Sequence, residues 1–309
     1  MSEADKKGTG AKRQQRKPLS SRPTLVAMLM LAPALTVLTT FVFFPVVYVV
    51  FLSFLDWDLI SPDKQFVGLD NYVDLAQSGE FRAVLLRTVV YSAATAAITL
   101  PLALLLAVFL NQKFRGRNIY RTILSSPFAV PLVGSAVIWL WLYDPSYGLI
   151  NYLLSLVGVQ GPTWLESSST ALLSVIIVSV WHYVGYYALL FLVGLQDIPT
   201  ELYEAARIDG AGRWSEFWNI TLPLLSPTVL FASTVSVIQS FQVFDQVYVL
   251  TNGGPANSTT TLIFYLYEQG FRFFHIGTAA AVSVFLLLSL ITFTILHLRL
   301  SRRWVHYEV

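Results

Sequence analysis

The hydrophobic residues of this chain fall into six long runs that are separated by shorter polar stretches. The runs cover about residues 24–54, 83–110, 122–143, 170–195, 220–244 and 276–298. About 20 apolar residues suffice for a helix to cross the hydrocarbon core of a bilayer. The pattern therefore predicts an all-α integral membrane protein with six transmembrane helices. The first run is longer than one straight crossing needs, and Pro33 and Pro45 are tolerated there as kinks.

A short polar helix is predicted between the fourth and fifth runs. Pro199 closes the preceding run, Thr200 is expected to cap the helix, and Glu201 favours its first turn. Gly210 is suited to the left-handed conformation that ends a helix and turns the chain. A second helix start follows at Trp214, an aromatic residue typical of a membrane–water interface. We expect this short helix to stand outside the bilayer, joined to a membrane helix at each end.

Composition agrees with a membrane protein and argues against an enzyme. The chain is 55% hydrophobic and only 12% charged, with a mean hydropathy of +0.61. It has no cysteine, which excludes disulfides and thiol chemistry. No glycine-rich phosphate loop of the G-x-x-x-x-G-K-[ST] type occurs, so this chain is not expected to bind or hydrolyse ATP. The four histidines show no metal-site spacing, and no acid–base pair suggests a membrane enzyme.

The distribution of positive charge predicts the orientation in the membrane. Segments 1–23, 111–121, 196–219 and 299–309 hold 16 Lys and Arg residues, whereas the three alternating loops, 55–87, 144–169 and 245–275, hold four. Cytoplasmic loops carry the excess of Lys and Arg in membrane proteins. Both termini and the polar helix are therefore predicted to be cytoplasmic. Segment 1–23 is read as a disordered basic tail that contributes to this signal.

Two motifs carry a resemblance to a known family. From Glu204 to Pro223 the chain reads Glu-Ala-Ala, two residues, Asp-Gly-Ala, eight residues, Ile, one residue, Leu-Pro. This spacing resembles the EAA loop of the membrane subunits of ATP-binding-cassette (ABC) importers. The run from Tyr248 to Pro255, Tyr-Val-Leu-Thr-Asn-Gly-Gly-Pro, resembles the carbohydrate-uptake branch, of maltose or multiple-sugar type. The resemblance covers roughly residues 24–300.

The resemblance implies a fold, a set of partners and a mechanism. The fold would be the type I ABC importer permease (MetI-like) fold, with a permease domain at 24–300, a cytoplasmic coupling loop at 196–219 within it, and a tail at 301–309. A second related permease, two ATPase subunits that bind ATP and Mg, and an extracytoplasmic sugar-binding protein would be its partners in a bacterial inner membrane. The chain would bind no cofactor or nucleic acid itself, and transport would proceed by alternating access.

The resemblance assigns ATPase coupling to the polar helix. Its two alanines would let the helix seat deeply in a groove of the partner, its acids would offer acceptors to basic groups, and its apolar residues would contact the partner or cover the membrane side. Arg207 and Arg213 would form ion pairs with acidic side chains or lie near phospholipid headgroups. The predicted coupling residues are Leu202, Tyr203, Glu204, Ala205, Ala206, Asp209, Gly210 and Ala211.

Polar residues inside two of the runs are candidates for the substrate path. Polar groups in a membrane are costly and usually face a cavity, and amides, hydroxyls and aromatic rings suit a sugar. The predicted residues are Ser179, His182, Tyr183, Tyr186, Ser236, Gln239, Ser240 and Gln242. Each is equally suited to bonding a neighbouring helix. Asp245 and Gln246 are expected in water at the outer end of the fifth span, and Thr251–Pro255 suits a structural turn as well as a contact with substrate or binding protein.

Three alternatives remain from sequence. An ion-coupled secondary transporter is disfavoured because charged residues inside the runs are nearly absent. An importer of a glycerol-phosphate-like substrate stays open, although the candidate path carries no arginine cluster to grip a phosphate. A membrane enzyme lacks credible catalytic groups.

Overall fold

The computed structural model describes residues 21–61 and 63–305, so the predicted basic tail, 1–23, lies almost wholly outside the described residues, as do residues 306–309. The chain divides into two compact units, residues 1–48 and 49–309. The described part is almost entirely helical. The α-helices are α1 Ser21–Leu38, α2 Phe44–Leu52, α3 Asp70–Gln77, α4 Gly79–Asn111, α5 Arg117–Ala129, α6 Leu132–Leu142, α7 Leu149–Leu156, α8 Ala171–Gln196, α9 Thr200–Ile208, α10 Arg213–Glu216, α11 Leu222–Leu224, α12 Ser226–Phe241, α13 Asp245–Leu250, α14 Leu262–Tyr267 and α15 Ile276–Ser301.

Three π-helical turns and one small hairpin complete the structure. The π turns are η1 Thr39–Phe43, η2 Phe217–Thr221 and η3 Glu268–Arg272. Strands β1 Leu55–Asp56 and β2 Gln65–Phe66 pair antiparallel. Two of the π turns precede a proline closely, at Pro45 and Pro223. Because a proline ring clashes with the carbonyl four residues earlier, a local widening of the helix accommodates it.

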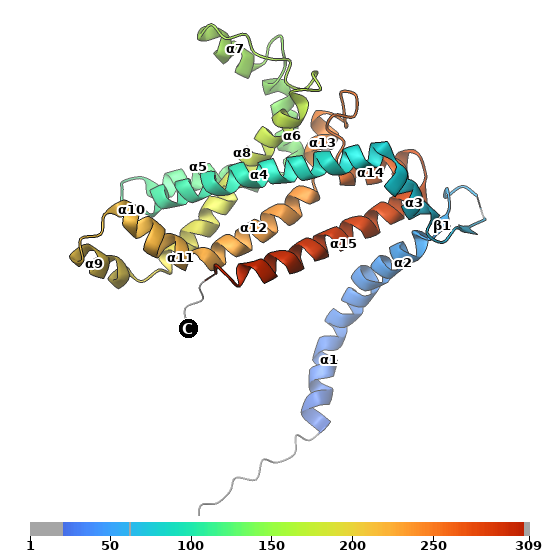
Figure 1. The fold of residues 1–309 in the computed structure, drawn as a ribbon, viewed down its shortest axis with the longest axis horizontal. Coiled ribbons are helices and arrows are strands. Elements are labelled where there is room, and N and C mark those ends of the chain that lie inside the picture. Colours follow the sequence, from blue (N-terminus) through green and yellow to red (C-terminus); the bar gives the residue numbers. More distant parts are fainter. Residues whose placement is uncertain (1–20, 62, 306–309) are drawn as a thin grey trace, which may run out of the picture. The chain divides into compact units, whose positions relative to one another are not determined.

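The larger unit is a bundle built around α4 and α8. Figure 1 shows α4, α12 and α15 running lengthwise in this unit, with α9 and α10 at one end and α3 at the other. Small residues allow α4 and α8 to approach closely, since Ala103, Ala107 and Ala188 are fully buried between larger side chains. A Cβ on Gly185 would overlap the backbone carbonyl of Leu124, so α5 also lies directly against α8.

Six membrane crossings are present only if two bent helix pairs each count as one. Within the described residues, four helices are long and apolar enough to span a bilayer: Val26–Leu52, Gly79–Asn111, Ala171–Gln196 and Ile276–Ser301. The predicted third span is instead α5 and α6, which meet at 98°. The predicted fifth span begins at Arg213 rather than near residue 220, and it bends by 65° between its two halves.

Prolines explain both bends. Pro131 separates α5 from α6, and the residue before a proline is disfavoured in the α conformation; Val130 is accordingly extended, with ψ 135°. In the fifth span, Pro227 has no N–H to donate to the carbonyl of Pro223. The hydroxyl of Ser226 donates to that carbonyl instead, at 2.5 Å. The backbone is thus kept satisfied where the helix changes direction.

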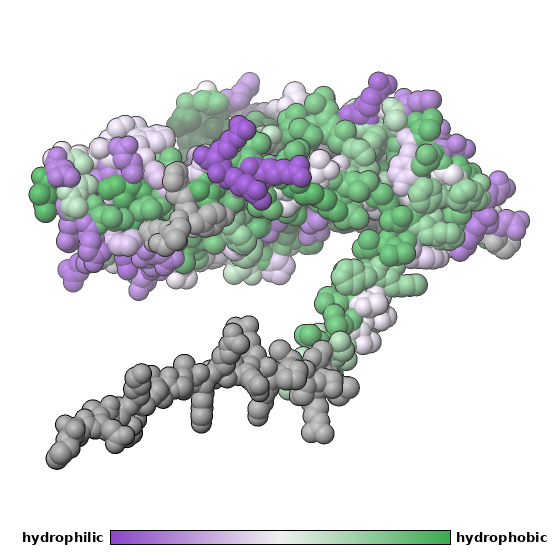
Figure 2. Space-filling model, turned by 60° about the horizontal axis from the view of Figure 1, so that its bottom comes forward, coloured by the Kyte–Doolittle hydropathy of each residue, from purple (hydrophilic) through white to green (hydrophobic). Residues whose placement is uncertain are grey.

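The surface of the larger unit follows the membrane pattern. In the view of Figure 2, hydrophobic residues cover much of its length, whereas hydrophilic residues gather toward its two ends and in one further cluster between them. Many of the large exposed side chains are apolar residues of α4, α6 and α15, including Leu86, Leu105, Ile138 and Leu288. A surface of this kind suits lipid or another membrane subunit rather than water.

Candidate functional site

The first candidate site is the elbow, residues 209–212, which joins α9 to α10 at one end of the bundle. Gly210 has φ +84°, as the sequence predicted. The N–H of Ala211 donates to the carbonyl of Ala206 at 2.9 Å, and the N–H of Gly210 donates to that of Arg207 at 3.1 Å. These two bonds form a Schellman motif, which satisfies the last carbonyls of α9. The predicted cap is wrong, because Thr200 is the first helical residue and Pro199 holds the cap position without a side-chain bond.

Two side-chain links hold the arms of the elbow together. Arg207 donates from Nε to Oε1 of Glu216 at 2.7 Å and from Nη2 to Oε2 at 3.2 Å. The Glu216 side chain is only 9% exposed, whereas that of Arg207 is 63% exposed. The hydroxyls of Tyr203 and Thr221 lie 3.0 Å apart. The bond to Glu216 raises the pKa of Arg207 above its ordinary value, and the ion pair links α9 to α10.

The helix α9 presents two different faces. Tyr203 and Ala206 are half-buried toward the bundle, and Tyr203 packs in the core around α8. Ala205 is exposed on the opposite side, and the side chain of Ile208 is 87% exposed. Leu202, Glu204, Asp209 and Gly210 are exposed as well, and Ala211 is half-buried. Ile208 was missed by sequence reasoning, although an isolated isoleucine on a polar helix was a visible signal.

The second candidate site is a small polar pocket of about 130 Å³ between α4, α8 and the end of α12. Four of the predicted path residues line it, namely Tyr183, Gln239, Ser240 and Gln242. Lining residues that were not predicted are Tyr91, Leu132, Val243, Phe244, Asp245 and Gln246. No Lys or Arg is among the residues that line this pocket. Its polar surface is made of neutral amides and hydroxyls together with one carboxyl group.

The other predicted path residues lie away from the pocket. Ser179 and Ser236 are buried, and Ser179 Oγ donates to the carbonyl of Val175 at 2.9 Å. His182 is 4% exposed and packs edge-on against Tyr183, with no hydrogen-bond partner for Nδ1 among the described residues. Tyr186 stacks on Phe128 with ring centroids 4.5 Å apart. These four are therefore buried or packed against neighbouring side chains, and their contact with a substrate stays a prediction.

A hydrogen-bond network that sequence reasoning missed supports the pocket. The hydroxyls of Tyr91 and Ser179 lie 2.7 Å apart, and Gln246 Nε2 donates to Ser179 Oγ at 3.3 Å. Gln246 is 2% exposed, so the expectation that it lies in water is wrong. Tyr187 donates from its hydroxyl to Oε1 of Gln239 at 2.8 Å. The two residues of each pair are 52 to 88 positions apart in sequence, so no local sequence pattern predicts these hydrogen bonds.

The Thr251–Pro255 stretch forms a closely bonded turn. Thr251 Oγ1 lies 2.7 Å from Thr259 Oγ1, and Thr260 Oγ1 donates to the carbonyl of Gly253 at 3.2 Å. Arg272 donates to Oδ1 of Asn252 at 2.5 Å. Gly253 has φ +82°, and a Cβ there would collide with the ring of Phe264. Of the readings left open, these contacts support the structural turn.

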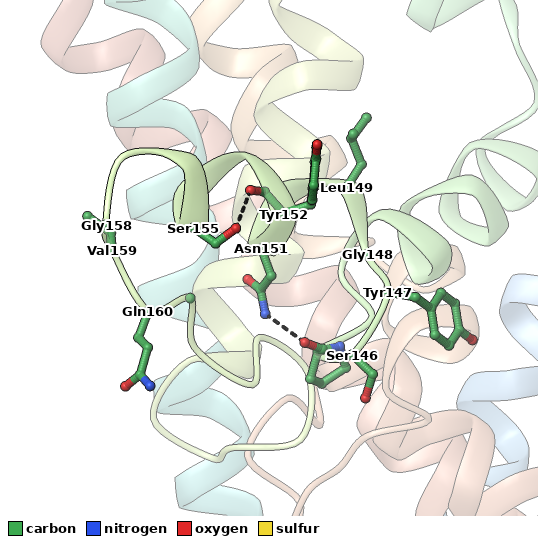
Figure 3. Close-up of a pocket in the computed structure, with 12 residues that line it drawn as sticks. Ser146, Tyr147, Gly148, Leu149, Asn151, Tyr152, Ser155, Gly158, Val159 and Gln160 are labelled. Atoms are coloured by element: carbon green, nitrogen blue, oxygen red, sulfur yellow. Dashed lines mark hydrogen bonds between the residues drawn. The ribbon is translucent and has the colours of Figure 1, made fainter.

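A larger hollow of about 730 Å³ lies in the segment that joins α6 to α8. Figure 3 shows it between α7 and the loop that follows, with Asn151 pointing inward and Gln160 pointing away. Asn151 donates to the carbonyls of Pro145 and Pro162 and accepts from Trp164 Nε1 at 2.7 Å. Backbone N–H groups of this segment hold the pKa of Asp144 below its ordinary value. The inward-pointing amide of Asn151 is thus already hydrogen-bonded within the loop and shapes it.

No group of His, Asp and Glu side chains within the described ranges is arranged to hold a metal ion. The long apolar helices, the bent helix pairs and the polar pocket between helices are features of a polytopic membrane protein. The sequence from residue 99 to 306 matches the family described as "Binding-protein-dependent transport system inner membrane component". This chain belongs to that family.

Individual relatives indicate which kind of transport system within this family the chain resembles. The trehalose/maltose transport system permease protein MalF of Thermococcus litoralis is 38% identical over 287 residues, which cover 92% of this chain and 96% of that protein. The sn-glycerol-3-phosphate transport system permease protein UgpA of Yersinia pestis is 36% identical over 283 residues, covering 91% and 95%. The chain is therefore a permease subunit of a binding-protein-dependent ABC importer and not itself the catalytic subunit, and the ion-coupled alternative is not supported.

The fold agrees with solved structures. A chain of a bacterial alginate ABC transporter, crystallised with an alginate pentasaccharide-bound periplasmic protein, superposes with a TM-score of 0.82 at 23% identity, covering 94% of this chain and 98% of that one. This likeness confirms the predicted ABC permease fold.

Proposed function

We propose that this permease imports a neutral carbohydrate and that the polar pocket is its part of the substrate path. The observation that carries this proposal is the lining of the pocket, which offers amides, hydroxyls and aromatic rings but no Lys or Arg. Such groups match sugar hydroxyls and C–H faces. A phosphate would call for guanidinium or ammonium groups. The pocket therefore favours a trehalose- or maltose-like solute over the glycerol-phosphate named for the Yersinia relative.

A second permease subunit is proposed to complete the path. The pocket of about 130 Å³ is smaller than the roughly 300–1,000 Å³ of sites that enclose small molecules. Large apolar side chains are also left exposed on α4 and α6, for example Val90 and Val133. A related subunit that packs on these faces would supply the remaining wall, and an extracytoplasmic binding protein would deliver the sugar.

The elbow is proposed to face the cytoplasm and to receive an ATPase subunit that binds ATP and Mg. The excess of Lys and Arg in the segments at this end supports that orientation, with both termini inside. Three residues on the exposed face of α9 suit a groove on the partner. Glu204 offers a carboxylate, the small side chain of Ala205 allows close approach, and Ile208 offers an exposed apolar side chain. Closure of the ATPase pair would then move the elbow and, through it, α8 and α12, which gives alternating access.

The proposal is tested by reconstituting the permease pair with its ATPase and binding protein in vesicles. Uptake of labelled maltose or trehalose is expected to require internal ATP and to survive an ionophore, and glycerol 3-phosphate should not compete. Competition by glycerol 3-phosphate at concentrations similar to the sugar would overturn the assignment of a neutral substrate.

Replacement of Gln239 by alanine is expected to weaken sugar binding without impairing assembly. The side-chain amide borders the pocket, and the loss of one neutral hydrogen bond corresponds to roughly a 2- to 12-fold change in affinity. The sugar concentration for half-maximal uptake should rise accordingly while the maximal rate is kept. Tyr187→Phe should shift it less in the same direction, because the hydroxyl only orients Gln239. Gln160→Ala, in the exposed outer loop, is the control, and an unchanged value for Gln239→Ala would remove this residue from the path.

Glu204→Lys is expected to release the ATPase subunit from the permease. The side chain is exposed on α9, so the substitution should leave the fold intact while it reverses a charge offered to the partner. Co-purification of the ATPase with the permease should fall, and uptake with it. Glu166→Lys makes the same charge change at an exposed residue between α7 and α8 and should retain the ATPase. Full retention by Glu204→Lys would contradict the docking role of this face.

A further inference from the structure

A groove of about 780 Å³ lies on the inner side of the elbow, between the end of α4, the start of α5 and the two arms α9 and α10. We call it the elbow groove. Its walls carry Lys113 and Arg117 on one side and Arg207 and Arg213 on the other, together with Glu204 and Glu216. The groove adjoins the exposed face of α9 at Glu204, but it opens toward the bundle, because Tyr203, which also lines it, lies on the half-buried side of that helix.

The elbow groove carries more positive than negative charge. Glu216 is already engaged by Arg207 in the bidentate pair. The side chains of Lys113, Arg117 and Arg213 make no hydrogen bond or ion pair with any other residue in the described part of the chain. Arg121, one turn beyond Arg117 on α5, does not line the groove, but its buried Nε and Nη2 atoms also have no partner among those residues and add to the positive charge nearby. An anion with several acceptor oxygens would satisfy such a set of donors.

The floor and surroundings of the groove indicate an amphiphile rather than a soluble anion. Val108, Leu195, Ile198 and Phe217 form its apolar part, and the amides of Asn111, Gln112 and Gln196 border it. Just outside, the side chain of Trp214 is 75% exposed. Tryptophan side chains favour the headgroup level of a bilayer. The helix α4, at 33 residues, is about 50 Å long, so its end at this groove reaches the membrane surface.

We propose that the elbow groove binds the phosphate headgroup of an anionic phospholipid, such as phosphatidylglycerol. Lys113, Arg117 and Arg213 hold the phosphate oxygens, the amides bond the glycerol part, and the apolar floor takes the first methylenes of an acyl chain. The lipid thereby bridges the turn after α4 to the second arm of the elbow. The bound lipid fixes the position of the elbow against the bundle. The movement of the ATPase subunits is therefore transmitted more completely to the membrane helices when the lipid is present.

The test compares two matched triple variants of the assembled importer. The first removes the groove cations, Lys113→Gln, Arg117→Gln and Arg213→Gln. The second removes the same charge from exposed residues at the end of α15, Arg299→Gln, Arg302→Gln and Arg303→Gln. Each complex is delipidated and titrated with phosphatidylglycerol or phosphatidylcholine, and bound lipid is read by native mass spectrometry. ATPase stimulation by sugar-loaded binding protein is then measured in vesicles of each lipid.

The wild type and the α15 variant are expected to retain phosphatidylglycerol and to be stimulated more in its presence. The groove variant should lose affinity by roughly fivefold for each cation removed and should no longer distinguish the two lipids. Equal retention by both variants would overturn the proposal. Release of the ATPase by the groove variant in both lipids would also overturn it, since the groove would then be a protein contact. If inorganic phosphate alone restores full stimulation in phosphatidylcholine vesicles, the lipid is the wrong ligand.

Discussion

Gly210→Pro is expected to abolish sugar uptake while the permease still inserts into the membrane. Gly210 sits at φ +84°, whereas a proline ring holds φ near −65°. The substitution also removes the N–H that donates to the carbonyl of Arg207. The Schellman motif is thereby lost, and α9 can no longer turn back toward α10. Because the elbow lies outside the apolar helices, insertion should be spared.

A graded series makes this prediction specific to backbone conformation. Asparagine tolerates the left-handed region, so Gly210→Asn should keep most of the uptake. Gly210→Ala, which costs about 1–2 kcal/mol in that region, should fall between asparagine and proline. Gly212→Ala is the control, since Gly212 has φ −82° and a Cβ there meets no neighbour. ATP-dependent uptake in reconstituted vesicles, normalised to inserted protein, gives the ranking. Wild-type uptake by Gly210→Pro would show that the elbow does not transmit motion.

Sequence reasoning succeeded where the signal is local. The six apolar runs, the short helix outside them and its glycine terminus depend on residues within one or two turns of each other. Gly210 is the clearest case, because glycine adopts the left-handed conformation that the turn requires without the steric cost of a Cβ. The bends within the third and fifth spans were not predicted, although Pro131 and Pro227 were available as signals for them.

The polar pocket could be predicted only in part. Gln239, Ser240 and Gln242 border it, but Ser236, on the same helix, is buried one turn away. Helical spacing predicts which residues share one face of a helix, but it does not predict which neighbouring helix packs against that face. The partners that decide it, Tyr91 for Ser179 and Tyr187 for Gln239, come from distant helices. A polar residue in a membrane helix therefore marks either a cavity or a helix contact until the packing is known.

Reversing the charge at Arg207 is expected to uncouple ATP hydrolysis from transport. In Arg207→Glu, two carboxylates would meet where a bidentate pair now joins α9 to α10, and Glu216 is nearly buried. The arms of the elbow should separate. The exposed face of α9 would remain, so the ATPase should still bind and hydrolyse ATP at its basal rate. What should be lost is uptake, together with the stimulation of hydrolysis by the sugar-loaded binding protein.

The exchanged pair, Arg207→Glu with Glu216→Arg, separates this role from a direct contact with the ATPase. If the pair acts within the elbow, the double variant should recover uptake relative to either single reversal, with a coupling of roughly 2- to 150-fold, the range for residues in contact. Arg207→Lys should be intermediate, because an ammonium cannot reproduce the two parallel bonds of the guanidinium. A double variant as inactive as Arg207→Glu alone, with the ATPase released, would mean that Arg207 binds the partner instead. The elbow would then be held by Tyr203 and Thr221 without the ion pair, and rigidity could no longer explain how motion reaches α12.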